Sequence, residues 1–303
     1  MIAHCSPDSL SSSTLFIPIL IIIFFGEDIF ENNLEPEVYS FQLLEKVIYE
    51  AEKQGLTDYP VHIKLDTGMH RLGFEEKDIT KLIERIKSQN ALKIRSIFSH
   101  LVGSDSSVFD AFTELQIKKF QRIRKVFEEN FNHKILAHIL NSAGIERFNQ
   151  YQFDMVRLGI GHYGMSAATT NVLEEVCTLK TKILQIRKVP ASETIGYSRK
   201  GVLKRDSIIG AIPIGYADGL NRKLGNYKGK VLVNDHFAPF IGNICMDVCM
   251  IDLTDVPQVK EGDDVIIFGK GHSIQDVAQT LETIPYEVLA GISKRVKRVY
   301  YKE

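Results

Sequence analysis

The chain has 303 residues, of which 44% are hydrophobic and 25% are charged, so it can bury one large or two medium-sized cores. A formal net charge of −1 argues against the basic surfaces that bind nucleic acids or anionic membranes, and we expect neither partner. The four cysteines show no CxxC pair and no metal-finger spacing, which favours reduced thiols in a cytoplasmic protein.

Residues 1–34 differ in composition and hydrophobic pattern from the rest of the chain, and we predict that they form an atypical leader. Their apolar run from Leu15 to Gly26 is interrupted by Pro18 and is shorter than the roughly 20 residues that cross a bilayer. A signal peptide would carry a basic first segment, whereas no lysine or arginine precedes Lys46. We interpret the run as a buried strand; a membrane role, a mis-assigned start and a truncated gene product stay open as alternatives.

Helical and strand-like patterns alternate along residues 35–168. Helices are expected over 41–55, 75–89, 109–131 and 143–148, and strands over 59–67, 92–101, 134–142 and 153–164. The strands are nearly continuous apolar runs, which is typical of a parallel sheet wrapped by helices. Four or five strands are too few to close an eight-stranded barrel. We therefore predict an α/β fold in which 35–168 form the second half of a (β/α) barrel.

Residues 169–303 have a different pattern. Short β runs separated by Pro, Gly and Asp-rich turns predict a mostly antiparallel C-terminal β domain. A helix is expected over 273–284, and a basic strand over 293–303 is expected to end the chain. No internal repeat or low-complexity linker is present.

Eight segments after residue 35 occur in the order and spacing found in alanine racemases. They are "HIKLDTGMHRLGF", "SHLVGSDS", "HILNSAGI", "DMVRLGIGHYG", "ETIGYSRKG", "PIGYADGLNRKL", "GNICMDVCMIDLTDV" and "PYEVLAGISKRVKRVY". The chain resembles that family, and in detail it is similar to racemase domains fused behind a cell-wall peptide (Mur) ligase. The resemblance implies an α/β barrel with a C-terminal β domain, pyridoxal 5'-phosphate as cofactor, and a homodimer with shared active sites. Its implied reaction interconverts L-alanine and D-alanine, the latter for peptidoglycan.

Racemisation removes an α-hydrogen that is too weakly acidic at neutral pH unless the substrate is joined to an electron sink. Inversion then takes one acid or base on each face of the carbon. In alanine racemases one is the lysine that holds the cofactor, and the other is a tyrosine of the partner subunit, which the motif "ETIGYSRKG" matches to Tyr197. A phenol has an ordinary pKa of about 10, so it needs cationic or hydrogen-bonding help to act as a base. The resemblance implies that His100 supplies part of that help.

Arg157 in "MVRLG" matches the family position that faces the pyridine nitrogen of the cofactor. An arginine stays protonated, so it donates a hydrogen bond to that nitrogen without readily giving up a proton. The cofactor is then a weaker electron sink, which limits side reactions. The alternative, an arginine in a surface ion pair, fits poorly between the apolar runs "FDMV" and "LGIG".

The phosphate of the cofactor needs small residues with free backbone N–H groups at helix or turn starts. Asn141, Ser142, Gly159 and Ile160 match the family's cofactor-binding positions, and Tyr286 in "PYEVL" is implied to reach them from the β domain. Taken alone, "NS" before a helix is an ordinary N-cap.

Substrate contacts are implied at Arg71, at the backbone N–H of Met246 in "CMD", and at Tyr216 of the entry corridor. Lys64 matches a position that is carbamylated in many racemases, which would let it brace Arg71. A plain salt bridge from Lys64 to Asp66 or another carboxylate is an equal alternative, and a bound chloride is a third. The remaining histidines show no metal spacing, so we expect no metal and interpret them as mostly structural.

The family lysine that binds the cofactor lies in a segment reading roughly "VKANAYG", and residues 1–34 contain no lysine. Two hypotheses follow: a racemase chain whose lysine is encoded upstream or lost from the gene product, and a catalytically silent fragment that acts as a dimerisation or cofactor-binding module. A broad-specificity racemase and a decarboxylase of the same barrel class fit "GYSRKG" and "CMD" less well.

Overall fold

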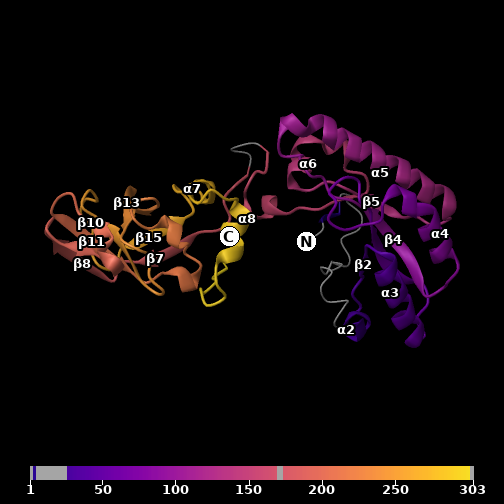
Figure 1. Ribbon diagram of the computed structural model, residues 1–303, viewed down its shortest axis with the longest axis horizontal. Coiled ribbons are helices and arrows are strands. Elements are labelled where there is room, and N and C mark those ends of the chain that lie inside the picture. The colour runs from indigo at the N-terminus through magenta and orange to yellow at the C-terminus, as the bar shows by residue number, and fades with distance from the viewer. Residues whose placement is uncertain (1–2, 5–25, 169–172, 301–303) are drawn as a thin grey trace. The chain divides into compact units, whose positions relative to one another are not determined.

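The computed structural model describes residues 3–4, 26–168 and 173–300, and the chain divides into two compact units (Figure 1). Unit 1 comprises Met1–Glu174 and unit 2 comprises Glu175–Glu303. The apolar run of the predicted leader lies outside the described residues up to position 25.

A four-stranded parallel sheet forms the centre of unit 1. Its order is β2 (Glu37–Val38), β3 (Tyr59–Lys64), β4 (Leu92–Phe98) and β5 (Leu136–His138). The connections run through α3 (Phe41–Lys53), α4 (Ile79–Lys87) and α5 (Asp110–Asn130), which flank the strands (Figure 1). This alternation of parallel strands and helices confirms the predicted α/β class with a partial barrel.

The helices of unit 1 follow from their sequence patterns. The Ser40 hydroxyl caps α3 by accepting a hydrogen bond from the backbone N–H of Leu43. Apolar residues recur on one face of each helix, so that face packs on the sheet and the charged face meets solvent. Phe120 and Phe127 of α5 are fully buried in the resulting core.

Two parts of unit 1 depart from the expected elements. The strand predicted over 153–164 is only β6 (Met155–Val156), which pairs antiparallel with β1 (Ala3–His4), and the chain then turns into the 3₁₀ helix η4 (Ile160–Tyr163). Ahead of the sheet, α2 (Gly26–Glu31) contributes Ile29 and Phe30 to the core. The remaining short helices are η1 (Glu76–Asp78), η2 (Ser107–Phe109), α6 (Ser142–Arg147) and η3 (Asn149–Tyr151).

Unit 2 contains a seven-stranded sheet in which all neighbours are antiparallel. Its order is β7 (Leu179–Lys182), β15 (Asp264–Phe268), β12 (Lys230–Val233), β13 (His236–Ile241), β14 (Cys249–Asp252), β11 (Ser207–Ile212) and β8 (Gln185–Val189). A separate ribbon pairs β9 (Thr194–Ile195) with β10 (Gly201–Val202). The prediction of a mostly antiparallel C-terminal domain is therefore confirmed.

The end of unit 2 is helical and then irregular. The predicted helix is α7 (Ile274–Thr280), capped by a reciprocal pair of hydrogen bonds between Ser273 and Asp276, and α8 (Pro285–Gly291) follows. The predicted terminal strand is wrong for residues 293–300, which form a turn and extended chain without strand pairing. The physical reason is local: the Arg298 guanidinium donates to backbone carbonyls of residues 292, 293 and 296.

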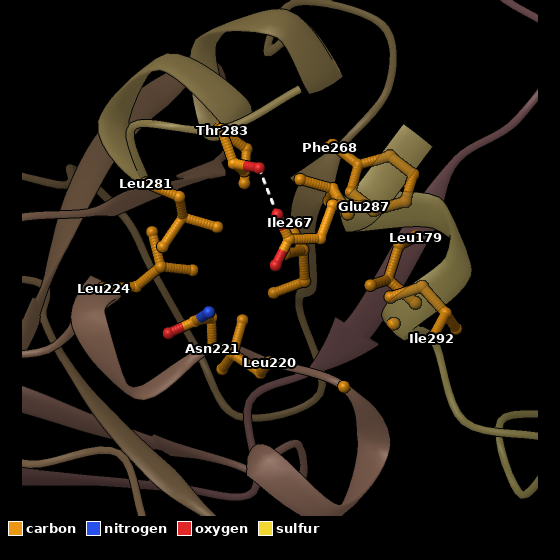
Figure 2. A pocket seen from close by; sticks show the side chains of 14 residues that line it. Leu179, Leu220, Asn221, Leu224, Ile267, Phe268, Leu281, Thr283, Glu287 and Ile292 are labelled. Carbon is orange, nitrogen blue, oxygen red and sulfur yellow. Dashed lines mark hydrogen bonds between the residues drawn. The ribbon is translucent and has the colours of Figure 1, made fainter. Parts of the chain in front are cut away.

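A small cavity of unit 2 lies against α8 (Figure 2). Leucine, isoleucine, valine and phenylalanine side chains dominate its walls, and the Thr283 hydroxyl and the Glu287 carboxylate are hydrogen-bonded at its edge. None of the predicted site residues lines this cavity. The predicted site residues lie instead at the strand ends of unit 1 and in the loops of unit 2.

Candidate active site

Polar residues gather in unit 1 where the parallel strands end. Lys64 closes β3, His100 follows β4, and Asn141 and Ser142 follow β5. Arg157 follows β6, which lies outside the parallel sheet, but its backbone N–H donates to the carbonyl of Leu140 just after β5 at 3.0 Å. Because parallel strands present their carboxyl ends at one edge, these side chains from distant parts of the sequence share one region.

Arg157 lies at the centre of this group, half-buried and held by five acceptor atoms, one of which is the His138 carbonyl oxygen at 3.4 Å. Its Nη1 donates to Nδ1 of His138 at 2.5 Å, and its Nη2 donates to the carbonyl oxygen of Ser99 at 2.5 Å. Longer contacts of 3.3–3.4 Å reach the carbonyl of Ile139 and Nδ1 of His100. No described residue accepts from its Nε–H, and that atom is not sealed in the core. The guanidinium is thus fixed with one donor left over.

Burial and mutual repulsion shape the pKa values here. Burial lowers the pKa of Arg157 to about 10, so the guanidinium keeps its charge at neutral pH. Burial, followed by the positive charges of Arg157, Arg71 and Lys64, lowers the pKa of His100 to about 4. The pKa of His138 lies well below its usual range for the same reasons, burial first and Arg157 second. Both rings are therefore neutral in a cationic surrounding.

A second cluster lies at the start of α6. The backbone N–H groups of Gly159 and Gly161 both donate to the Ser142 hydroxyl oxygen, at 2.9 and 3.2 Å. Asn141 caps the helix by accepting from the N–H of Gly144. Ile160 is buried between the two donating glycines. Converging amides and a hydroxyl form a cradle of the kind that binds anions.

Lys64 and Asp66 are not paired with each other. The Lys64 ammonium lies 3.0 Å from Glu37 of β2, and both side chains are buried. Asp66 instead accepts from the backbone N–H groups of Gly68, Met69 and His70, which tightens the turn after β3. The structure therefore contains a salt bridge of Lys64 to a carboxylate other than Asp66, namely Glu37. Carbamylation of Lys64 stays a prediction.

In unit 2 the turn of Tyr216 and the loop of Met246 are joined. The Tyr216 N–H donates to the carbonyl of Cys245 at 3.0 Å, and the next N–H donates to the carbonyl of Met246 at 3.1 Å. A Cβ on Gly215 would lie only 2.2 Å from that Met246 oxygen, so glycine permits the contact. Arg295 adds a bridge, donating to Asp218 at 2.6 Å and to Asp247 at 2.7 Å. These hydrogen bonds therefore hold the two predicted substrate contacts beside each other.

The backbone of Tyr197 is hydrogen-bonded to Asn243, which lies just before the loop of Met246. The Tyr197 carbonyl accepts from the Asn243 side chain at 3.2 Å, and its own side chain is 72% exposed, which leaves the phenol accessible. Tyr286 lies on α8, also with an exposed side chain. The predicted residues thus form one group in unit 1 and another in unit 2.

Family comparisons give this geometry a context. The alanine racemase N-terminal domain matches residues 18–167, and the alanine racemase C-terminal domain matches residues 176–300. Alanine racemase 1 of Clostridium acetobutylicum is 40% identical over 288 residues, covering 91% of this chain and 73% of the relative. The alanine racemase of Thermodesulfovibrio yellowstonii is 40% identical over 294 residues, covering 95% and 78%. The chain belongs to the alanine racemase family.

Solved structures agree with this assignment. The alanine racemase of Bartonella henselae, with covalently bound pyridoxal phosphate, has a TM-score of 0.82 at 29% identity and covers 94% of this chain and 77% of that one. The enzyme of Streptomyces coelicolor A3(2) has a TM-score of 0.84 at 28% identity, covering 91% and 75%. The family resemblance and the fold expected from the eight segments are confirmed. None of the helices in the described residues is long and apolar enough to cross a bilayer.

The residues of unit 1 fit pyridoxal phosphate. Arg157 offers one uncommitted N–H, suited to an aromatic nitrogen that must remain an acceptor. The glycine amides that converge on Ser142 suit a phosphate group. The cations that depress the pKa of His100 suit a ligand with several negative charges.

Sequence reasoning missed several residues of this site. Glu37, the partner of Lys64, is not among the predicted residues, although a glutamate within the strand-like patch "EPEVY" is an available signal. His62 and His138 were treated as structural, and Ser96 was not considered. Arg295 was assigned to a terminal strand, because its segment alternates basic and apolar residues.

Proposed function

We propose that this chain serves the pyridoxal-phosphate-dependent interconversion of L-alanine and D-alanine; its relatives are named alanine racemases, and one solved relative carries covalently bound pyridoxal phosphate. The observation that carries the proposal is Arg157: a charged guanidinium held by five acceptor atoms, with only Nε–H left for a ligand. When bound, pyridoxal phosphate supplies the electron sink that makes the α-hydrogen of alanine removable. Arg157 would donate a hydrogen bond to the ring nitrogen without protonating it, which would keep the cofactor a weaker electron sink.

His100 fits a supporting role for the second base. Its Nδ1 faces the Arg157 guanidinium, which can only donate, so the ring proton sits on Nε2. That Nε2–H is available to stabilise the phenolate of Tyr197, which we propose comes from a partner subunit. Tyr197 then takes or returns the proton at one face of the substrate α-carbon.

The other residues fit binding roles. Asn141, Ser142, Gly159 and Ile160 form the phosphate cradle, and Tyr286 is proposed to close it. Arg71, the Met246 N–H and Tyr216 are proposed to hold the substrate carboxylate and bound the entry corridor. The homodimer, the cytoplasmic location, peptidoglycan supply, and the division into a leader (1–34), partial barrel (35–168) and β domain (169–303) belong to the same proposal.

A second candidate function is the catalytically silent module named in the sequence analysis. A chain that binds pyridoxal phosphate without a covalent bond would be a silent cofactor-binding or dimerisation module. Both functions predict cofactor binding, and only the first predicts racemisation.

The test combines a cofactor titration, borohydride reduction and a D-alanine assay on the full chain. We expect saturable binding, and a covalent adduct with D-alanine formation from L-alanine if the chain is an active racemase. Arg157→Lys should weaken binding by about tenfold, since it loses several hydrogen bonds, while Arg205→Lys on the surface should not. Equal binding by wild type and Arg157→Lys would refute the proposed site, and binding without adduct or turnover would support the silent module.

A further inference from the structure

A row of hydrogen bonds runs beneath Arg157 across the parallel sheet. Arg157 Nη1 lies 2.5 Å from His138 Nδ1, and His138 Nε2 lies 3.2 Å from the Ser96 hydroxyl. That hydroxyl lies 2.6 Å from His62 Nδ1, and His62 Nε2 lies 2.8 Å from a carboxylate oxygen of Glu35. We call Glu35, His62, Ser96 and His138 the buried chain. Three of its members are at most 3% exposed, and Glu35 is half-buried.

The sheet register creates this row. His62 of β3 is the direct register partner of Ser96 in β4, and Ser96 is the partner of Leu136 in β5. Side chains alternate along a strand, so His138, two residues after Leu136, returns to the same face. Three adjacent strands thus each contribute one polar side chain to one line.

The chemistry of the end groups fixes the direction of every bond. An arginine has no acceptor, so His138 Nδ1 must accept, and its ring proton then sits on Nε2 and is donated to Ser96. The Ser96 hydroxyl hydrogen is left for His62 Nδ1, which places the His62 proton on Nε2, facing Glu35. All bonds therefore donate away from Arg157 and toward a carboxylate.

Glu35 is a suitable terminus. Burial alone would raise its pKa, but the hydrogen bond from His62 and nearby charges, including Arg95 at 3.6 Å, lower it. A negative end polarises the row and strengthens each link. The row meets Arg157 where the guanidinium also lies 5.2 Å above the ring centre of Phe98, which stacks on His138 at 5.0 Å.

We propose that the buried chain positions Arg157. By fixing the tautomer of both rings, it holds the guanidinium in one orientation, with Nε–H turned away from the chain's bonds toward a ring nitrogen of a bound heteroaromatic ligand. The identity of that ligand rests on the proposed function, whereas the fixed tautomers and the fixed guanidinium do not.

The test is nuclear magnetic resonance of the full ¹⁵N-labelled chain without ligand. Long-range ¹H–¹⁵N spectra should show His62 and His138 neutral, each with its proton on Nε2. Ser96→Ala should mix the His62 tautomers and shift the Arg157 Nε–H signal, while Ser207→Ala, another buried serine, should change neither. A proton on Nδ1 of either wild-type ring, or unchanged signals in Ser96→Ala, would overturn the proposal.

A second variant covers the case in which Ser96→Ala does not fold. Glu35→Gln removes the negative end but keeps an acceptor, so the His62 Nε2–H signal should move upfield; the matched surface change Glu45→Gln should leave it in place. An unmoved signal in Glu35→Gln would also refute the chain. Pyridoxal phosphate is then titrated, and Ser96→Ala should bind about fivefold more weakly. If no form binds it while the tautomers are as stated, the proposed function fails and the positioning chain stands.

Discussion

Acid should destabilise unit 1 because two of its histidines, His100 and His138, are held neutral. Burial and adjacent cations lower the pKa of His100 from 6.5 to about 4. The unfolded chain leaves this ring near its ordinary pKa, so between pH 6.5 and 4 the unfolded state binds a proton that the folded state does not. Folding stability from His100 is therefore complete above pH 6.5 and is lost as pH falls toward 4.

The size of the effect follows from the two pKa values. Integrating the proton difference for His100 gives a loss of about 2 kcal/mol between pH 7 and pH 5, and about 3 kcal/mol by pH 4. His138, whose pKa is also well below its usual range, adds to the loss in the same direction. A domain with a stability of about 5–15 kcal/mol would register such a change clearly.

Urea unfolding followed by circular dichroism at 222 nm is the assay, since the long helices α3, α4 and α5 belong to unit 1. His100→Gln should reduce the drop between pH 7 and 5 by about 2 kcal/mol. Ser207→Ala is the control, because it destabilises without removing a titrating group. A full wild-type drop in His100→Gln would refute the reasoning on the buried ring.

Three further changes test the local geometry. Lys64→Met should cost about 3–5 kcal/mol in urea unfolding, because it leaves Glu37 as a buried charge without its ammonium partner; a cost under about 1 kcal/mol would show that the pair is not buried together. Gly215→Ala should lower the melting temperature of unit 2, since the added methyl meets the Met246 carbonyl at 2.2 Å, and an unchanged melting curve would contradict that contact. Arg295→Met should leave global stability nearly unchanged, because an exposed ion pair contributes little, yet it should accelerate hydrogen exchange of the amides in the adjoining turn; unchanged exchange would count against the bridge.

The alternation of the elements was predictable because it depends on local periodicity. The apolar spacing of α3 and α5 and the buried runs of β3 and β4 are visible in the sequence and occur in the structure. The terminal strand failed because alternating basic and apolar residues satisfy a strand pattern, whereas Arg298 draws the backbone into a local turn. The periodicity of a sequence predicts which side chains share one face of an element. It does not predict which backbone carbonyls those side chains bind.

The site likewise contains residues that could be predicted from the sequence and residues that could not. The functional role of Arg157 could be predicted because a charged residue between two apolar runs is unusual, and because the motif around it matches a cofactor-binding position of the family. The pairing of Glu37 with Lys64 and of Ser96 with His62 could not be predicted, since these partners lie 27 and 34 positions apart along the chain and are brought close only by the register of a parallel sheet. Register depends on packing of whole strands, so no short sequence window contains it.

We expect the Arg157 guanidinium, fixed at every other donor, to offer Nε–H to a ring nitrogen and to leave that nitrogen unprotonated. The ¹⁵N shift of the pyridine nitrogen in labelled pyridoxal phosphate bound to the full chain measures this directly. The expected shift is that of an unprotonated, hydrogen-bonded ring nitrogen, and it should move toward the free value in Arg157→Lys. A protonated nitrogen, or a shift that Arg157→Lys leaves unchanged, would contradict it.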